Sequence, residues 1–324
     1  MQKIKNQKCP ILVIVGPTGV GKTALSIALA KAFQGEIINA DSMQVYRGLD
    51  IGTAKVTEKE KESIPHHLFD VCDVEDFYTV YDYQKDAREK IREIEERGHT
   101  PIFVGGTGLY LKAALYRYDF QKESVYDGCR DKSNEEIMQF LEERKVSHEI
   151  HIHNRKRLIR LYNRVLNHNL PTNSGNEVLY DFICIGLTAP RDQLYRRIDE
   201  RVDQMIQNGL MDEVRSFYDQ NIRSKALQTG IGYKEWYDYF DGDQTLSETI
   251  AKIKQNSRHY AKRQYTFFRH QLPVTWFEVN YNNFQVTIDE IKTYCQKQFQ
   301  NKKSRDFLFG LLINCCIKIM LVCL

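Results

Sequence analysis

Short apolar runs alternate with helically spaced apolar positions along the first hundred residues of the chain. The runs at 11–15, 36–40 and 102–104 are rich in isoleucine and valine and predict buried strands. Between the first two runs, and again from Tyr81 to Arg97, apolar residues recur with the period of a helix. Strands that alternate with helices favour a parallel sheet, whose ligands gather at the carboxyl ends of the strands.

The pattern changes between residues 118 and 180, where no strand is predicted. The stretches "NEEIMQFLEERK" and "NRKRLIRLYNRVLN" have helical spacing, and polar, loop-like stretches bound the segment. A strand returns in "DFICIGLTAP", followed by a helix interrupted near Gly209, a basic helix and a last strand in "PVTWFEV". We therefore predict an α/β fold, a parallel sheet flanked by helices with a smaller helical insertion domain. The predicted parts are 1–117, the first part of the core; 118–180, the insertion; 181–300, the second part of the core with the basic helix; and 301–324, an apolar C-terminal tail.

The loop after the first predicted strand has the pattern G-x-x-x-x-G-K-[ST]. Its defining residues are Gly16, Gly21, Lys22 and Thr23. Glycines let backbone N–H groups turn toward phosphate oxygens, the following helix contributes its positive end, and the lysine adds a full charge. The threonine hydroxyl is the usual protein ligand of Mg²⁺ in such loops. We name residues 16–23 the phosphate loop.

Two more polar loops follow predicted strands, "ADSMQVYRGLDIGTAK" and "GGTGLY". Asp41 follows the second strand, where it could cap a helix, accept a proton from a nucleophile or coordinate a metal. Capping alone does not explain why Met43, Gln44 and Tyr46 share this loop, so we favour a chemical role. The adjacent histidines 66 and 67 have no third ligand nearby, and we expect them to order a loop.

Charge is unevenly distributed although the 324-residue chain carries a formal net charge of only +3. Neither Ile150–Asn176 nor Ala251–Phe277 contains an acid, and both are rich in lysine and arginine. In the second stretch Lys254, Arg258 and Lys262 recur every four residues, on one helical face. Solvated helix faces would explain one such stretch. Two of them indicate a polyanion larger than a nucleotide, and nucleic acid is the obvious candidate.

The cysteines and the end of the chain bear on the cellular setting. The eight cysteines form no C-x-x-C pair, which favours a reduced, cytoplasmic protein without a structural metal. The apolar residues 307–324 are interrupted by Asn314 and Lys318 and are short for a spanning helix. We expect a buried or sticky terminal helix there rather than membrane contact, and a monomer with no obligate protein partner.

Taken together, these segments resemble the tRNA dimethylallyltransferase family. The resemblance rests on "GPTGVGKT", "ADSMQVYRGLDIGTAK", "PHHLFD", "GGTGLYLKA", "NRKRLIR", "LYRRIDERVDQMIQNGLMDEV", "GIGYKE" and "YAKRQYTFFR", in family order over residues 11 to 278. It implies a P-loop NTPase-like fold and transfer of a dimethylallyl group from dimethylallyl diphosphate to the N6 amine of the adenosine just 3′ of the anticodon. The phosphate loop would then hold a leaving diphosphate rather than a transferred phosphate.

The resemblance also assigns residues. It implies diphosphate binding by Gly16, Pro17, Thr18, Gly19, Val20, Gly21, Lys22 and Thr23. Contact with the tRNA anticodon stem-loop is implied for Asp41, Ser42, Met43, Gln44, Thr107, Arg130, Lys156, Arg157, Arg160, Lys234, Lys262, Arg263, Gln264 and Arg269. The catalytic assignments are Asp41 as proton acceptor, Lys22, Arg197 and Thr23 as stabilisers of the leaving diphosphate, and Mg²⁺ on Thr23.

Two other functions use some of the same residues. A P-loop kinase for a small metabolite would need Lys22, Thr23 and an aspartate near its acceptor, but it leaves the basic stretches unexplained. An NTP-dependent RNA-binding switch explains the basic stretches but gives Asp41 no chemical task. Both remain alternatives to the prenyltransferase at the level of the sequence.

Overall fold

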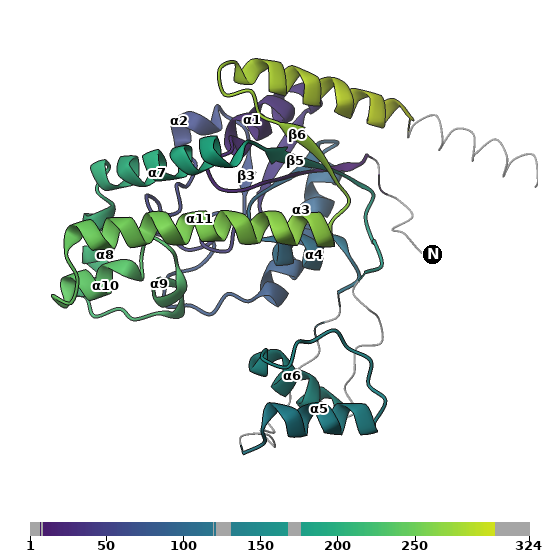
Figure 1. Ribbon diagram of the computed structural model, residues 1–324. Helices are drawn as coiled ribbons and strands as arrows, with labels where there is room; N and C mark the ends of the chain where they lie inside the picture. Colours follow the sequence, from purple (N-terminus) through teal and green to yellow (C-terminus); the bar gives the residue numbers. More distant parts are fainter. Residues whose placement is uncertain (1–6, 8, 119, 121–130, 168–175, 302–324) are drawn as a thin grey trace, which may run out of the picture. The chain divides into compact units, whose positions relative to one another are not determined.

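A single parallel sheet organises the larger part of the molecule. The computed structural model describes residues 7, 9–118, 120, 131–167 and 176–301. Within these residues six strands run parallel in the order β3-β2-β4-β1-β5-β6 (Figure 1). Their bounds are β1 (Ile11–Val15), β2 (Gly35–Asn39), β3 (His66–His67), β4 (Thr100–Val104), β5 (Phe182–Thr188) and β6 (Val274–Glu278). The predicted parallel sheet is confirmed.

Helices connect the strands and cover both faces of the sheet (Figure 1). Those of the sheet-bearing part are α1 (Lys22–Phe33), α2 (Glu58–Lys61), α3 (Val80–Glu96), α4 (Gly108–Leu115), α7 (Arg191–Gln207), α8 (Leu210–Asp219), α9 (Lys225–Thr229), α10 (Glu235–Phe240) and α11 (Leu246–Gln271). A further helix over 284–301 follows β6. The predicted break lies between α7 and α8, where Gly209 adopts a φ of 94° that favours glycine.

The core forms where the strands are buried on both faces. Every residue of β1 and β2 is buried, as their apolar runs predict for central strands. On one face Leu12 and Ile14 pack with Leu25 and Leu29 of α1, and Ile291 of the last helix joins the same cluster. On the other side, α3 and α4 pack together and α3 contacts β2 and β4. These layers fix the loops at the carboxyl ends of the strands.

Strand β3 is the one strand that the sequence pattern missed within the described residues. Only His66 and His67 form it, and a two-residue segment shows no periodicity. His67 Nε2 lies 2.6 Å from Glu36 Oε2, and His66 Nδ1 lies 2.8 Å from the carbonyl oxygen of Ile64. The histidine pair orders the chain, as predicted, but as the edge of the sheet and not as a loop.

Residues 116–178 form a second compact unit. It contains α5 (Asn134–Glu143) and α6 (Arg155–Leu166), which pack through a small apolar cluster that includes Ile137, Leu141 and Leu158. Asn154 caps α6 by accepting a hydrogen bond from the backbone N–H of Arg157. The opposite face of α6 exposes Lys156, Arg157 and Arg160.

Two sequence predictions concern residues outside the described ranges. Arg130, an expected tRNA contact, and the apolar tail 307–324 both lie there. Among the described residues, no helix combines the length and the apolar character that crossing a membrane requires.

Candidate active site

The phosphate loop joins the end of β1 to the start of α1. Gly16 and Gly21 have φ values of 148° and 99°, in the region that favours glycine. A Cβ on Gly16 would lie 2.8 Å from the carbonyl oxygen of Leu187, so β5 packs directly on the loop. The Lys22 ammonium donates hydrogen bonds to the carbonyl oxygens of Gly16, at 3.1 Å, and Pro17, at 2.8 Å. Two carbonyl oxygens of the phosphate loop therefore bind the lysine of the same loop.

Lys22 shares this space with a second half-buried cation, Arg201 of α7. Burial lowers the pKa of Lys22 to about 7, the positive charge of Arg201 adds to the fall, and Asp41 opposes it. Burial likewise lowers the pKa of Arg201. Arg201 donates one hydrogen bond, from Nη2 to the Thr53 carbonyl oxygen at 3.3 Å, while its buried Nε has no partner among the described residues. Two desolvated cations with an unused donor are suited to a multiply charged anion.

Arg197 lies one helical turn before Arg201 on α7. Its Nε donates to the Gly19 carbonyl oxygen at 3.3 Å, and its guanidinium lies 4.5 Å from the centre of the Tyr281 ring. Arg197 is therefore at the phosphate loop but exposed, whereas Arg201 is its half-buried neighbour. Sequence reasoning singled out Arg197 and missed Arg201, although the four-residue spacing in "RIDER" places both on one helical face.

Asp41 lies at the end of β2, near these cations. Its Oδ1 accepts a hydrogen bond from the Met43 N–H at 2.9 Å, so the carboxylate does order its own loop. Its Oδ2 accepts no hydrogen bond from the described residues and would be 3.7 Å from a Cβ on Gly106. The charge of Asp41 acts on Lys22, Arg201 and Tyr260, as the pKa shifts of these three groups record. One oxygen has a structural role and the other is open for chemistry.

The residues after Asp41 are held by the loop that follows β4. Thr107 Oγ1 accepts a hydrogen bond from the Ser42 N–H at 3.0 Å and donates to the Ser42 hydroxyl at 3.2 Å. Gln44 donates from Nε2 to the Thr53 carbonyl oxygen at 3.0 Å, and Met43 packs on Gly230. Thr107 therefore positions the loop that contains Asp41.

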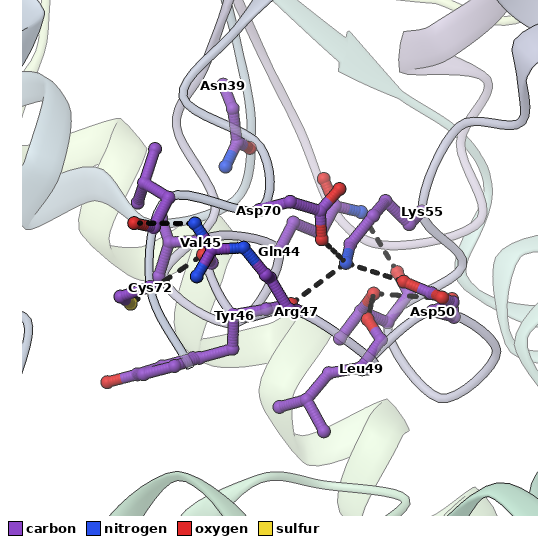
Figure 2. Close-up of polar contacts among 12 residues, drawn as sticks. Asn39, Gln44, Val45, Tyr46, Arg47, Leu49, Asp50, Lys55, Asp70 and Cys72 are labelled. Carbon is purple, nitrogen blue, oxygen red and sulfur yellow. Dashed lines mark hydrogen bonds and ion pairs between the residues drawn. The ribbon is translucent and has the colours of Figure 1, made fainter. Parts of the chain in front are cut away.

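Lys55 fastens the far end of the same loop. Its side chain is 7% exposed and its ammonium contacts the Tyr46 carbonyl oxygen at 2.9 Å, Asp50 at 2.6 Å and Asp70 at 2.5 Å. Figure 2 shows these bonds converging on one nitrogen. We name residues 41–57 the 41–57 loop. Lys55 connects Tyr46 and Asp50 of this loop to Asp70, in the segment that follows β3.

Gln264 of α11 connects two of the three polar loops. Its Oε1 accepts from the Thr18 N–H at 3.2 Å, and its Nε2 donates to the Gly106 carbonyl oxygen at 3.1 Å. The residue is 4% exposed, so its amide faces the site and not the surface. Tyr260, one turn earlier, has a pKa raised by burial and by Asp41, with hydrogen bonds to Thr107 and Gln264 acting in the opposite direction.

The basic face of α11 has two halves with different surroundings. Lys254 pairs with Asp203 at 2.6 Å and Arg258 pairs with Asp199 at 2.5 Å, both acids of α7. The stretch Ala251–Phe277 contains no acid of its own, but acids of α7 neutralise these cations of its first half, which the sequence did not predict. Lys262 and Arg263 are exposed and, with Thr266 and Phe267, line a shallow hollow. Arg269 is also exposed and lies 5.4 Å from the centre of the Tyr265 ring.

The segment 229–234 is mostly structural. Gly232 and Tyr233 are buried, and Lys234 is half-buried at the start of α10. Thr23, the second residue of α1, is exposed at the phosphate loop. The described part of the chain contains no group of three or more histidine, cysteine or acidic residues able to hold a metal.

Fold and site together define a protein of the P-loop NTPase-like class, in which the glycine-rich loop, two cations and an open carboxylate lie at the carboxyl ends of the strands. The sequence profile of the family described as "IPP transferase" matches residues 44–271. The tRNA dimethylallyltransferase of Bacillus subtilis (strain 168) is 46% identical over 297 residues, covering 85% of this chain and 93% of that protein. This chain therefore belongs to the IPP transferase family of tRNA dimethylallyltransferases.

Solved structures agree with this assignment. The full-length tRNA isopentenylpyrophosphate transferase from Bacillus halodurans superposes with a TM-score of 0.73 at 40% identity, covering 92% of this chain and 99% of that one. A eukaryotic dimethylallyltransferase acting on tRNA gives a TM-score of 0.68 at 27% identity, covering 83% of this chain and 74% of that one. The predicted P-loop NTPase-like fold is confirmed.

Proposed function

We propose that this enzyme transfers a dimethylallyl group from dimethylallyl diphosphate to the N6 amine of the adenosine 3′-adjacent to the tRNA anticodon. One observation supports this reaction above the others. An open carboxylate oxygen of Asp41 lies in the field of two half-buried cations, Lys22 and Arg201. A carboxylate suits the acceptance of an amine proton, and the cations suit a departing diphosphate.

The chemistry of the leaving group follows from the cations. The bond between the allylic carbon and the diphosphate oxygen breaks, and the electron pair leaves with the diphosphate. Lys22, Arg201 and the phosphate-loop N–H groups are arranged before the reaction, so stabilising the new charge costs little reorganisation. Arg197 is close enough to the loop, through Gly19, to add a further charge.

The nucleophile needs the carboxylate. The adenine amine is weak because its lone pair is delocalised into the ring, so it must be held in line with the allylic carbon. As the new nitrogen–carbon bond forms, the amine loses a proton, and Asp41 Oδ2 accepts it. Ser42, Met43 and Gln44 follow Asp41 directly in the sequence, and their side chains suit binding of the base after it has left the stack of the anticodon loop.

A magnesium ion is compatible with the residues present. Mg²⁺ keeps several waters and takes few protein ligands when a substrate supplies phosphate oxygens. The hydroxyl of Thr23, an exposed residue of the phosphate loop, would hold it, so the lack of a larger acidic cluster among the described residues is no obstacle. The ion would neutralise charge on the diphosphate.

The exposed cations suit the RNA. Lys262, Arg263 and Arg269 on α11, and separately Lys156, Arg157 and Arg160 on α6, are exposed and fit the phosphates of an anticodon stem-loop. Lys234 would also contact the RNA. We propose that the enzyme acts in the cytoplasm and as a monomer, with tRNA and dimethylallyl diphosphate as its partners.

The decisive test follows two labels. Purified enzyme is incubated with tRNA and either allyl-labelled dimethylallyl diphosphate or γ-labelled ATP. Capture of the allyl label on N6 of the adenosine, without ATP turnover, supports the proposal. Phosphate transfer to a small acceptor would favour a kinase, and RNA binding that depends on ATP without any covalent product would favour a switch.

A further inference from the structure

A carboxylate remote from the reacting groups holds the centre of the 41–57 loop. Glu213 lies in the first turn of α8, and its two oxygens accept hydrogen bonds from three consecutive backbone N–H groups. Oε2 accepts from Asp50 at 3.1 Å and Ile51 at 2.7 Å, and Oε1 accepts from Gly52 at 3.1 Å. Three N–H groups bound to one carboxylate fix the orientation of this part of the loop.

Tyr233 completes the binding of the carboxylate. Its hydroxyl donates to Glu213 Oε1 at 2.6 Å, and its ring is fully buried. A Cβ on Gly52 would lie 2.6 Å from the Tyr233 ring, so only glycine leaves room for the ring at this position. Burial and the charge of Glu213 raise the pKa of Tyr233, so its hydroxyl stays a donor.

The turn that Glu213 holds presents its carbonyl oxygens to the active site. The Thr53 carbonyl oxygen accepts from Arg201 Nη2 at 3.3 Å and from Gln44 Nε2 at 3.0 Å. Gln44 also reaches the Ala54 carbonyl oxygen at 3.4 Å. The N–H side of one short turn is therefore bound to Glu213, while its carbonyl side orients a diphosphate-binding cation and a base-binding amide.

Lys55 does not replace this support. It joins the Asp50 side chain at the start of the turn to Asp70 and to the Tyr46 carbonyl oxygen (Figure 2), but it contacts neither the Thr53 carbonyl oxygen nor Arg201. With Glu213 removed, three N–H groups at the start of the turn would lose their acceptor, and the carbonyl of Thr53 would lose its fixed direction.

We propose that Glu213, together with Tyr233, is a positioning residue that sets Arg201 and Gln44 for reaction through the 50–54 turn. This inference rests on the proposed function for the roles of Arg201 and Gln44. A displacement of about 1 Å of a positioned group costs about 10²-fold in rate. Glu213→Gln keeps the size of the side chain but turns an amide donor toward N–H donors. We expect kcat to fall about 10- to 100-fold while tRNA affinity stays within a few-fold.

A matched control separates positioning from folding. Glu235 is a 1% exposed carboxylate that accepts from the Gly232 N–H at 2.8 Å and from Asn256 at 2.7 Å, but it does not touch the turn. Glu235→Gln should destabilise the protein comparably and leave kcat unchanged below its unfolding temperature. Tyr233→Phe removes one of four donors to Glu213, so kcat should fall only a few-fold.

Two readouts do not depend on turnover. Inorganic pyrophosphate affinity, measured by calorimetry, should weaken in Glu213→Gln and not in Glu235→Gln, because Arg201 loses its orientation in the first variant alone. Amide hydrogen exchange over residues 44–54 should accelerate in the same variant. Wild-type kcat in folded Glu213→Gln, or equal losses in both variants, would overturn the inference. If the wild type makes no prenylated tRNA but Glu213→Gln still loses pyrophosphate affinity, the proposed function fails and the positioning role stands.

Discussion

At the scale of single residues, the site depends on side chains with one atom in a structural role and another left open. Asp41 uses Oδ1 for the Met43 N–H, and Arg201 uses Nη2 for Thr53, while Asp41 Oδ2 and Arg201 Nε have no partner among the described residues. The structural bond fixes the direction of the open atom. Substitutions should therefore be chosen to change the open atom and keep the bond.

Asp41→Asn meets that condition for the carboxylate. An asparagine oxygen can still accept from Met43, but the amide cannot take up the amine proton. We expect product formation to fall by about 10²- to 10⁴-fold, the range for loss of a general base, with tRNA affinity within a few-fold. Single-turnover assays beside filter binding measure both quantities. A variant with wild-type turnover would remove Asp41 from the mechanism.

Lys22→Met should stabilise the protein while it disables the enzyme. The pKa of Lys22 is about 7 in the folded protein and 10.5 in its ordinary state. Below pH 7 the folded chain bears the full cost of burying the charge, and this cost fades as pH rises from about 7 to 10.5. The melting temperature of Lys22→Met should exceed that of the wild type by a few degrees at pH 6 and approach it near pH 10. A variant that melts lower at pH 6 would contradict the assignment.

At the scale of elements, the edge of the sheet is held by a buried carboxylate. The carboxylate of Glu36 in β2 accepts two hydrogen bonds from Arg97, at 2.9 and 2.8 Å. Its oxygens also lie 2.6 Å from His67 Nε2 and 2.7 Å from His99 Nδ1. Burial works to raise the pKa of Glu36, but the hydrogen bonds from Arg97, His67 and His99 outweigh it and hold the pKa at about 2. The position of β3 therefore depends on the bond between His67 and the Glu36 carboxylate, because a two-residue strand contributes little backbone pairing.

This cluster gives a pH dependence with a definite sign. Because the pKa of Glu36 is lowered, its contribution to stability is complete above about pH 4.5 and is lost as pH falls toward 2. Glu36→Gln should lower the free energy of unfolding by about 3 kcal/mol at pH 7, the scale for breaking a buried ion pair. Denaturant titrations at pH 7 and pH 3 should show the difference from wild type shrinking at the lower pH. A constant difference would mean that the charge is not its source.

Helix α11 provides its own control for RNA binding. Lys262 and Arg263 are exposed without an acidic partner among the described residues, whereas Lys254 and Arg258 are paired with α7. Replacing the first two by alanine should reduce the slope of log affinity against log salt by roughly 1.4 to 1.8, and replacing the second two should leave the slope unchanged. Equal changes in both double variants would show that the ion pairs open on binding, and no change in either would exclude α11 from the RNA interface.

At the scale of the whole molecule, local patterns were predictable and long-range pairings were not. The phosphate loop has fixed spacing within eight residues, so the sequence alone was enough to find it. Arg201 belongs to the site only because α7 packs beside the 41–57 loop, where Arg201 contacts Thr53. Lys254 is neutralised by Asp203, which lies 51 positions away in the sequence. Gln264 illustrates the same limit: family resemblance suggested RNA contact, but its burial between Thr18 and Gly106 depends on how α11 packs.

The bond between Thr18 and Gln264 has a thermodynamic consequence for how the two substrates bind. A diphosphate that takes the Thr18 N–H must displace the Gln264 oxygen, on the helix that also carries Lys262 and Arg263. Occupancy at the loop is thereby linked to the state of α11, and linkage is reciprocal: the factor by which pyrophosphate changes the Kd for tRNA must equal the factor by which tRNA changes the Kd for pyrophosphate. Calorimetric titration of each ligand with and without the other measures this factor. Gln264→Leu lacks the amide oxygen that competes with diphosphate for the Thr18 N–H, so in this variant the factor by which one ligand changes the Kd of the other should approach one.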